Sequence, residues 1–260
     1  MSEIVFLIKF GERQFMERFA NGHLYFSNAL KFREIENNLM IKGQGDKLEG
    51  ASKIYATDFK ATSHESNDNV ISGKNINLYA NYAPANKLAV FCIMCCYEND
   101  CIRIDENIVR IKLRDDVVKD IKDHFPKADV GAVVLNPKRF ITNVEDFFNG
   151  ECKNGQVNYF NINGIASEGG IVGDMKYFEY LCQDVSPKKD GNKTSISFNA
   201  EYVYRSLQCK DIFFQKEQEY RFIVPTIEID YPKEFDINLD TQIKLFDFDD
   251  FIKGVDINIK

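Results

Sequence analysis

The chain has 260 residues, of which 44% are hydrophobic and 28% charged, the balance of a globular protein large enough to bury a core. The longest apolar run, Leu88–Tyr97, is half the length of a membrane span, so we expect no transmembrane segment. Most of the net charge of −7 comes from residues 226–260, where nine acidic residues stand against four lysines. The remaining chain is close to neutral, which excludes a global electrostatic attraction to nucleic acid.

Strand and helix patterns alternate without a regular βα repeat, which argues against a doubly wound sheet. Apolar runs predict strands at residues 4–8, 23–26, 88–97, 108–113, 130–135, 157–162, 220–224, 227–229, 243–246 and 255–259. Helical spacing predicts helices at residues 11–20, 30–36, 115–125, 137–147, 175–182 and 199–209. Polar stretches near 61–77 and 184–195 predict mobile loops. No repeat or long linker interrupts this pattern, so we expect residues 1–260 to form a single α+β domain.

The N-terminus and the cysteines indicate the compartment. Met1-Ser2-Glu3 leads directly into an apolar strand without a basic stretch or a cleavage site, so we expect no secretory signal and a cytoplasmic location. Seven cysteines are an odd number, and three of them crowd into residues 91–96, so no disulfide framework is expected. Cys92 and Cys95 form a C-x-x-C, but no second pair and no histidine pair follows at zinc-binding spacing. Buried thiols are therefore the prediction, and no metal site is expected.

Familiar catalytic motifs are missing from the sequence. It contains no phosphate-binding loop, no dinucleotide-binding glycine motif, no nucleophile elbow and no zinc-protease helix motif. The three histidines are His23, His64 and His124, and the last two fall in a polar loop and on a charged helix. Histidine-based acid and base catalysis therefore has few candidates.

One segment with a mixture of aromatic and charged residues suits a binding pocket. Aromatics alternate with charges over residues 25–36, and a glycine-rich loop follows at residues 43–50. Such a segment can offer stacking faces with charged ends to a ligand. The alternative interpretation makes Phe32 a core residue and pairs Arg33 with Glu36 on the surface.

A second segment places two carboxylates at the start of a late apolar strand. Glu217 and Glu219 are two residues apart, and residues two apart on a strand point to the same face. We expect both carboxylates to reach one small site, where mutual repulsion would raise one pKa. The alternative is an exposed, charged strand start without a function.

These segments resemble a group of bacterial proteins linked to abortive phage resistance, which looks like a branch of the ADP-ribosyltransferase superfamily. The matching stretches are residues 22–26, 32–34, 45–50, 131–140 and 217–221. The resemblance implies a split, largely antiparallel β-sheet flanked by helices. It also implies NAD as a substrate, Glu219 as the catalytic glutamate, and Glu217 as the group that orients or deprotonates the acceptor. Cleavage of the nicotinamide–ribose bond builds positive charge on the sugar, and a carboxylate stabilises that charge.

The resemblance further implies a set of NAD-binding residues. The superfamily normally holds the dinucleotide with an Arg or His on its first strand, where this chain offers only Lys9. A lysine supplies a charge without a bidentate fork, so Arg33 is the alternative for that role. The implied NAD-binding residues are Lys9, Tyr25, Phe26, Phe32 and Arg33. We expect the two glutamates to share a cleft with Tyr25, Phe26 and Arg33.

The function implied by the resemblance is that of a toxin or anti-phage effector that transfers ADP-ribose to a macromolecule. Basic residues early in the chain favour single-stranded RNA or DNA as the acceptor, because a base can stack on an aromatic while a few cations hold the backbone. These residues are Arg13, Lys31, Arg33, Lys42 and Lys47. An antitoxin or partner protein could cover the acidic C-terminal segment. The alternatives are an NAD glycohydrolase and a non-enzymatic phage-sensing or partner-binding protein with a degenerate site.

Overall fold

A computed structural model describes residues 3–39, 45–62, 69–81, 83–162, 175–182, 188–190, 193–195 and 200–259. The chain divides into two compact units, each built from separate stretches. The first unit comprises Met1–Lys47, Lys87–Val157 and Phe214–Lys260, and the second comprises Leu48–Asn86 and Asn158–Phe213. Every site residue predicted from the sequence belongs to the first unit. The assignment of a single domain stays a prediction.

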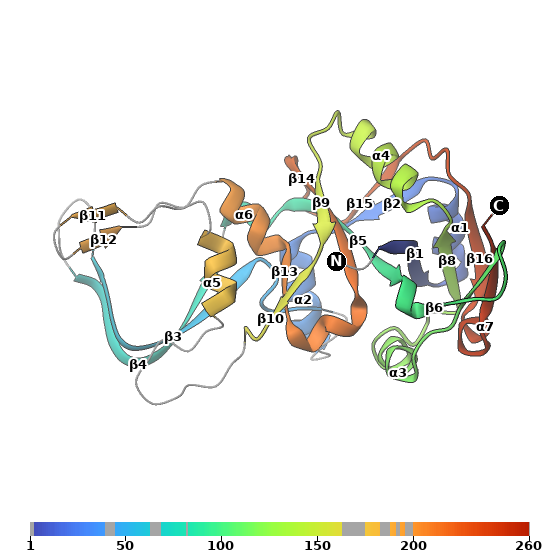
Figure 1. Cartoon of the computed structure of the whole chain (residues 1–260). Helices are drawn as coiled ribbons and strands as arrows, with labels where there is room; N and C mark the ends of the chain where they lie inside the picture. The colour runs from blue at the N-terminus through green and yellow to red at the C-terminus, as the bar shows by residue number, and fades with distance from the viewer. Residues whose placement is uncertain are drawn as a thin grey trace. The chain divides into compact units, whose positions relative to one another are not determined.

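An open, six-stranded, antiparallel sheet is the frame of the first unit (Figure 1), with the strand order β16-β8-β1-β5-β14-β9. Its strands are β1 (Ile4–Gly11), β5 (Leu88–Tyr97), β8 (Val130–Val134), β9 (Lys153–Gln156), β14 (Glu219–Glu228) and β16 (Ile243–Asp247). The central position of β5 explains its continuous apolar sequence, because both of its faces pack against other elements.

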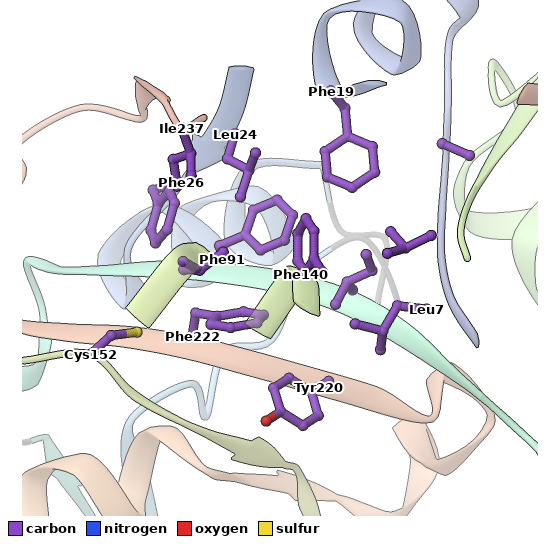
Figure 2. Packing of buried hydrophobic residues seen from close by; sticks show 14 of the residues in the cluster. Leu7, Phe19, Leu24, Phe26, Phe91, Phe140, Cys152, Tyr220, Phe222 and Ile237 are labelled. Atoms are coloured by element: carbon purple, nitrogen blue, oxygen red, sulfur yellow. The ribbon is translucent and has the colours of Figure 1, made fainter. Parts of the chain in front are cut away.

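One face of this sheet, the aromatic face, carries Phe91 of β5 and Phe222 of β14. Helices α1 (Arg13–Ala20) and α4 (Pro137–Phe147) cover it together with β2 (His23–Phe26), which pairs with β15 (Lys233–Asp236). Figure 2 shows Phe26, Phe91, Phe140 and Phe222 gathered over β5 and β14. The centroid of the Phe91 ring lies 5.5 Å from that of Phe26 and 6.0 Å from that of Phe222, within the range of favourable aromatic pairs.

The opposite side of the sheet, the reverse face, is covered differently along its width. Over β1 and β8 it packs against helices α3 (Asp115–His124) and α7 (Phe248–Lys253) and against a three-stranded sheet. The strands of that small sheet are β6 (Cys101–Arg103), β7 (Ile108–Ile111) and β17 (Val255–Asn258). On β14 the reverse face instead carries the charged residues Glu219 and Arg221, both buried.

The second unit contains a long hairpin of β3 (Ala51–Thr62) and β4 (Asn69–Asn81) and a short parallel pair of strands. The parallel pair is β10 (Asn158–Phe160) and β13 (Cys209–Asp211). Its other described elements are η1 (Ala83–Ala85), α5 (Met175–Cys182), β11 (Lys188–Asp190), β12 (Lys193–Ser195) and α6 (Ala200–Leu207). Among the described residues, none of the helices has the length and apolar character that crossing a membrane would require.

The predicted α+β class with a largely antiparallel sheet flanked by helices is confirmed. The two predicted loops are wrong in part. Strand β4 begins at Asn69 and pairs with β3, and β11 pairs with β12 inside residues 184–195. Backbone pairing satisfies the N–H and C=O groups of a strand whatever its side chains, so polarity alone does not predict a loop. The remaining parts of both predicted loops lie largely outside the described residues.

Candidate active site

The predicted catalytic glutamate follows a strained backbone position. Glu219 is the first residue of β14, and the 3₁₀-helix η3 (Ile212–Glu217) ends two residues earlier. Between them, Gln218 has a φ of 44°, in the left-handed region that costs a non-glycine residue about 1–3 kcal/mol. The carbonyl of Gln218 accepts a hydrogen bond from the Cys95 amide at 2.7 Å, which fixes this turn against β5. Strain of this kind gathers at functional positions.

The side chain of Gln218 adds a second unusual feature. Its Nε2 donates to Oδ2 of Asp100 at 2.9 Å. Its Oε1 is buried and accepts no hydrogen bond from the residues that the structure describes. A buried acceptor without a donor raises the free energy of the folded state. Gln218 therefore destabilises the fold both through its backbone conformation and through its buried side-chain oxygen, directly beside Glu219.

Glu219 is held by a buried ion pair. The Nε of Arg221 donates to Oε1 of Glu219 at 2.6 Å, and its Nη2 donates to Oε2 at 3.3 Å. The exposed fractions of the two side chains are 1% for Arg221 and 7% for Glu219. A fork of two hydrogen bonds fixes the orientation of a carboxylate as well as pairing its charge. Removal of either partner would break this pairing inside a buried site.

The neighbouring strand places a thiol beside this pair. Cys92 is the cross-strand partner of Arg221, so the two residues share the reverse face. Burial, followed by the negative charge of Glu219, raises the pKa of the Cys92 thiol well above its ordinary value. Cys92 therefore stays protonated at neutral pH and is not a candidate nucleophile.

Lys9, the predicted NAD-binding cation of the first strand, lies on the other face of the sheet from Glu219. It alternates on β1 with Ile8, which packs on the reverse face, and its Nζ lies 4.7 Å from the centroid of the Phe91 ring on the aromatic face. The Nζ also donates to the carbonyl of Cys92 at 2.6 Å. Desolvation by burial lowers the pKa of Lys9, which weakens it as a permanent cation.

The two glutamates do not lie on one strand face, contrary to the spacing prediction. Glu217 belongs to η3 and is half-buried, whereas Glu219 belongs to β14 and is buried. The left-handed turn at Gln218 separates them, so the alternation rule for strands does not apply to this pair. The ionic partner of Glu219 is thus Arg221 rather than a second carboxylate.

The aromatic segment near the N-terminus is divided between different environments. Phe26 is fully buried in the core of the aromatic face, so the predicted cleft of Phe26 with Glu219 is not formed. Tyr25 points the other way from β2 and is 58% exposed. Helix α2 (Ala29–Leu39) carries Phe32, which is half-buried, and Arg33, which is buried. The alternative interpretation of Arg33 as a surface residue is therefore wrong.

The basic residues predicted to hold a nucleic-acid backbone are partly neutralised. The guanidinium of Arg13 pairs with Asp247, and Nζ of Lys31 lies 3.5 Å from a carboxylate oxygen of Glu34. Lys47 is exposed. Arg33 is buried, as stated above, and Lys42 lies outside the described residues.

Comparison with family models, curated proteins and solved structures finds no match to this chain. The site therefore has to be argued from its own residues. In the described part of the chain, His, Cys, Asp and Glu form no group of three that could hold a metal ion. Arg221 was not predicted as the partner of Glu219, although a Glu and an Arg two residues apart on an apolar strand were a readable signal.

We predict that the ion pair behaves as a coupled unit in a double-mutant cycle. Glu219→Met and Arg221→Met should each lower the free energy of unfolding by about 3–5 kcal/mol, because each removes one half of a buried ion pair. The double variant should recover most of this loss, since two apolar side chains of similar length replace both ions. Glu217→Gln, at a half-buried position outside the pair, is the control and should change stability by less than ~1 kcal/mol. Denaturant unfolding measures all four; additive single losses would contradict the coupling.

We also predict a pH signature of Lys9. Its lowered pKa means that the unfolded chain binds a proton which the folded chain has released, so the stability contribution of Lys9 rises with pH up to about 10.5. The difference in unfolding free energy between the wild type and Lys9→Met should therefore increase through alkaline pH. Subtracting the variant removes the background of the tyrosines and of the cysteines other than Cys92, which interacts electrostatically with Lys9. A difference that falls as the pH rises would show that the ammonium is favoured by folding.

Proposed function

We propose that this protein is an NAD-dependent ADP-ribosyltransferase that acts as a toxin or anti-phage effector, with Glu219 as its catalytic carboxylate. The observation that carries the proposal is the oriented Glu219 paired with Arg221 at the start of β14, directly after the strained Gln218. Buried charge and backbone strain both oppose folding, and they lie at the residue that the family resemblance makes catalytic and at the residue directly before it.

The chemistry needs a carboxylate that is ready before the bond breaks. When the bond between ribose C1′ and nicotinamide breaks, its electron pair leaves with nicotinamide and positive charge develops on the sugar. Glu219 stabilises that charge by accepting a hydrogen bond from the 2′-hydroxyl, and the acceptor then attacks C1′. Arg221 is a positioning residue, because its fork holds the carboxylate in one orientation. Glu217, at the end of η3, removes the proton of the acceptor.

The proposed NAD contacts differ from the set that the resemblance implies. Lys9 and Phe26 lie on the aromatic face, on the other side of the sheet from Glu219, so in the proposal Arg33 supplies the cation and Phe32 the stacking ring. Arg33 is the better group for a pyrophosphate because its planar fork can bind two oxygens. The loop after α2 is tied to the helix, since the amide of Asp46 donates to the carbonyl of Phe32 at 3.2 Å.

The burial of Glu219 favours one competing function. A fully paired carboxylate with 7% of its side chain exposed also suits a non-enzymatic phage-sensing or partner-binding protein that keeps a degenerate site. An NAD glycohydrolase differs from the main proposal only in using water as the acceptor. The acceptor favoured in the proposal is single-stranded RNA or DNA, because duplex bases cannot stack on an aromatic side chain.

We predict that the purified protein transfers label from adenylate-labelled NAD to single-stranded RNA or DNA, with release of nicotinamide. Glu217→Gln should lower the transfer about 10²–10⁴-fold, because the general base is lost. Glu219→Asp keeps a charge opposite Arg221 but withdraws the carboxylate by about 1 Å, which should cost about 10²-fold. Circular dichroism and thermal unfolding check that both variants are folded.

The outcomes of this assay separate the candidates. Nicotinamide release without labelled acceptor identifies a glycohydrolase. Labelling of duplex or cell-extract protein, with none on single strands, contradicts the acceptor and leaves the NAD chemistry standing. A folded wild type that neither cleaves NAD nor transfers label contradicts the enzyme proposal and favours a binding protein.

A further inference from the structure

A pair of thiols lies at the end of β5, away from the chemistry assigned to Glu219. The Sγ atoms of Cys96, the penultimate residue of β5, and Cys101, the first residue of β6, are 3.5 Å apart. Only the short 3₁₀-helix η2 (Glu98–Asp100) and Tyr97 separate the two residues in the chain. Cys96 is buried and Cys101 is half-exposed, so one thiol of the pair can be reached from solvent.

We propose that Cys96 and Cys101 are a redox modification site that closes into a reversible intrachain disulfide. A disulfide bond is about 2.05 Å long, so the two sulfur atoms need to approach by only about 1.5 Å. The two cysteines of the C-x-x-C do not form a similar pair. Cys92 lies on the reverse face of β5, whereas Cys95 lies in the core of the aromatic face. The two thiols that sequence spacing marks as a pair are therefore separated by the sheet itself.

The two members of the pair are chemically different. The hydrogen bond that the two thiols share lowers the pKa of Cys101, while that same bond and then burial raise the pKa of Cys96. Cys101 is also the more exposed of the two, so it is the thiol that an oxidant meets first, and the buried Cys96 is the resolving thiol. Burial raises the pKa of both Cys95 and Cys152 to about 12, so these thiols stay protonated and inert.

The proposed oxidant is hydrogen peroxide, and the step balances. The Cys101 thiolate attacks one peroxide oxygen, the O–O bond breaks, and a sulfenic acid and water result once a proton is taken up. The Cys96 sulfur then attacks the sulfenic sulfur, and a second water leaves. Two thiols and one peroxide therefore give one disulfide and two waters. A dithiol reductant reverses the change by thiol–disulfide exchange.

The loop between the two thiols reaches the strained residue of the candidate site. Oδ2 of Asp100 accepts hydrogen bonds from the Tyr97 amide at 3.0 Å and from Nε2 of Gln218 at 2.9 Å. The disulfide would therefore close the loop whose Asp100 binds the side chain of Gln218. We infer that closure moves Asp100 and alters the protection of the backbone at Gln218. This consequence is structural and holds whatever reaction the protein catalyses.

The test treats the full chain with hydrogen peroxide and maps its peptides by mass spectrometry without reduction. We expect a cross-linked peptide of Cys96 and Cys101 that has lost two hydrogen atoms and that a dithiol reverses. Cys101→Ser should abolish the cross-link, and Cys95→Ser, a change at the adjacent buried thiol, should leave it intact. Oxidation of Cys101 to sulfinic acid without a cross-link, or loss of the cross-link in a folded Cys95→Ser variant, would overturn the assignment.

Hydrogen exchange tests the link to Gln218. Peptides that contain Gln218 and Glu219 should exchange at different rates in the reduced and oxidised wild type. Asp100→Ala removes the acceptor of the Gln218 side chain, so in this variant the cross-link should still form while the difference at Gln218 disappears. Equal exchange in reduced and oxidised wild type would overturn the proposed coupling and leave the disulfide itself standing.

Discussion

The buried ion pair between Glu219 and Arg221 is the interaction on which the interpretation of this protein depends. Two charges removed from water each carry a desolvation cost of several kcal/mol, and their attraction offsets that cost only in good geometry. Here a fork of two hydrogen bonds provides that geometry. The pair also excludes the simpler picture of Glu219 as an exposed carboxylate at the end of a strand.

The sheet explains how such a site can be maintained. On β14, residues alternate between the aromatic face, with Phe222 in the core, and the reverse face, with Glu219 and Arg221. Burial of each phenylalanine contributes about 1.5–3 kcal/mol, and rings from α1, β2 and α4 meet those of β5 and β14. Hydrogen-bonded neighbours β5 and β9 hold β14 on both sides. Strand β14 thus contributes Phe222 to the stability of the fold, and it also carries the buried ion pair, which opposes folding through its desolvation cost.

Much of this arrangement could be predicted from the sequence, because it follows from local periodicity. The buried run of β5 and the helix α4, which has Pro137 in its first turn and Asn136 as its N-cap, were both readable. Alternation along β2 also places Leu24 and Phe26 on one face, which already argued for Phe26 as a core residue. The same alternation along β1 places Lys9 and Ile8 on opposite faces of the sheet.

Other features depend on contacts that periodicity does not contain. The relation of Glu217 to Glu219 is set by the left-handed backbone of Gln218, and glutamine has no special preference for that conformation. The proximity of Cys96 to Cys101 and the bond from Gln218 to Asp100 depend on how β5 turns into β6. The resemblance gave a role to Glu219, and strand spacing places Arg221 on the same face, but spacing alone does not show that the two side chains are buried and paired.

The most direct test of this account measures NAD cleavage by the double variant Glu219→Met/Arg221→Met under conditions where it is folded. If the pair serves catalysis rather than stability, as proposed, nicotinamide release falls to background while the unfolding free energy stays close to that of the wild type. A folded double variant that releases nicotinamide at the wild-type rate would contradict the central claim.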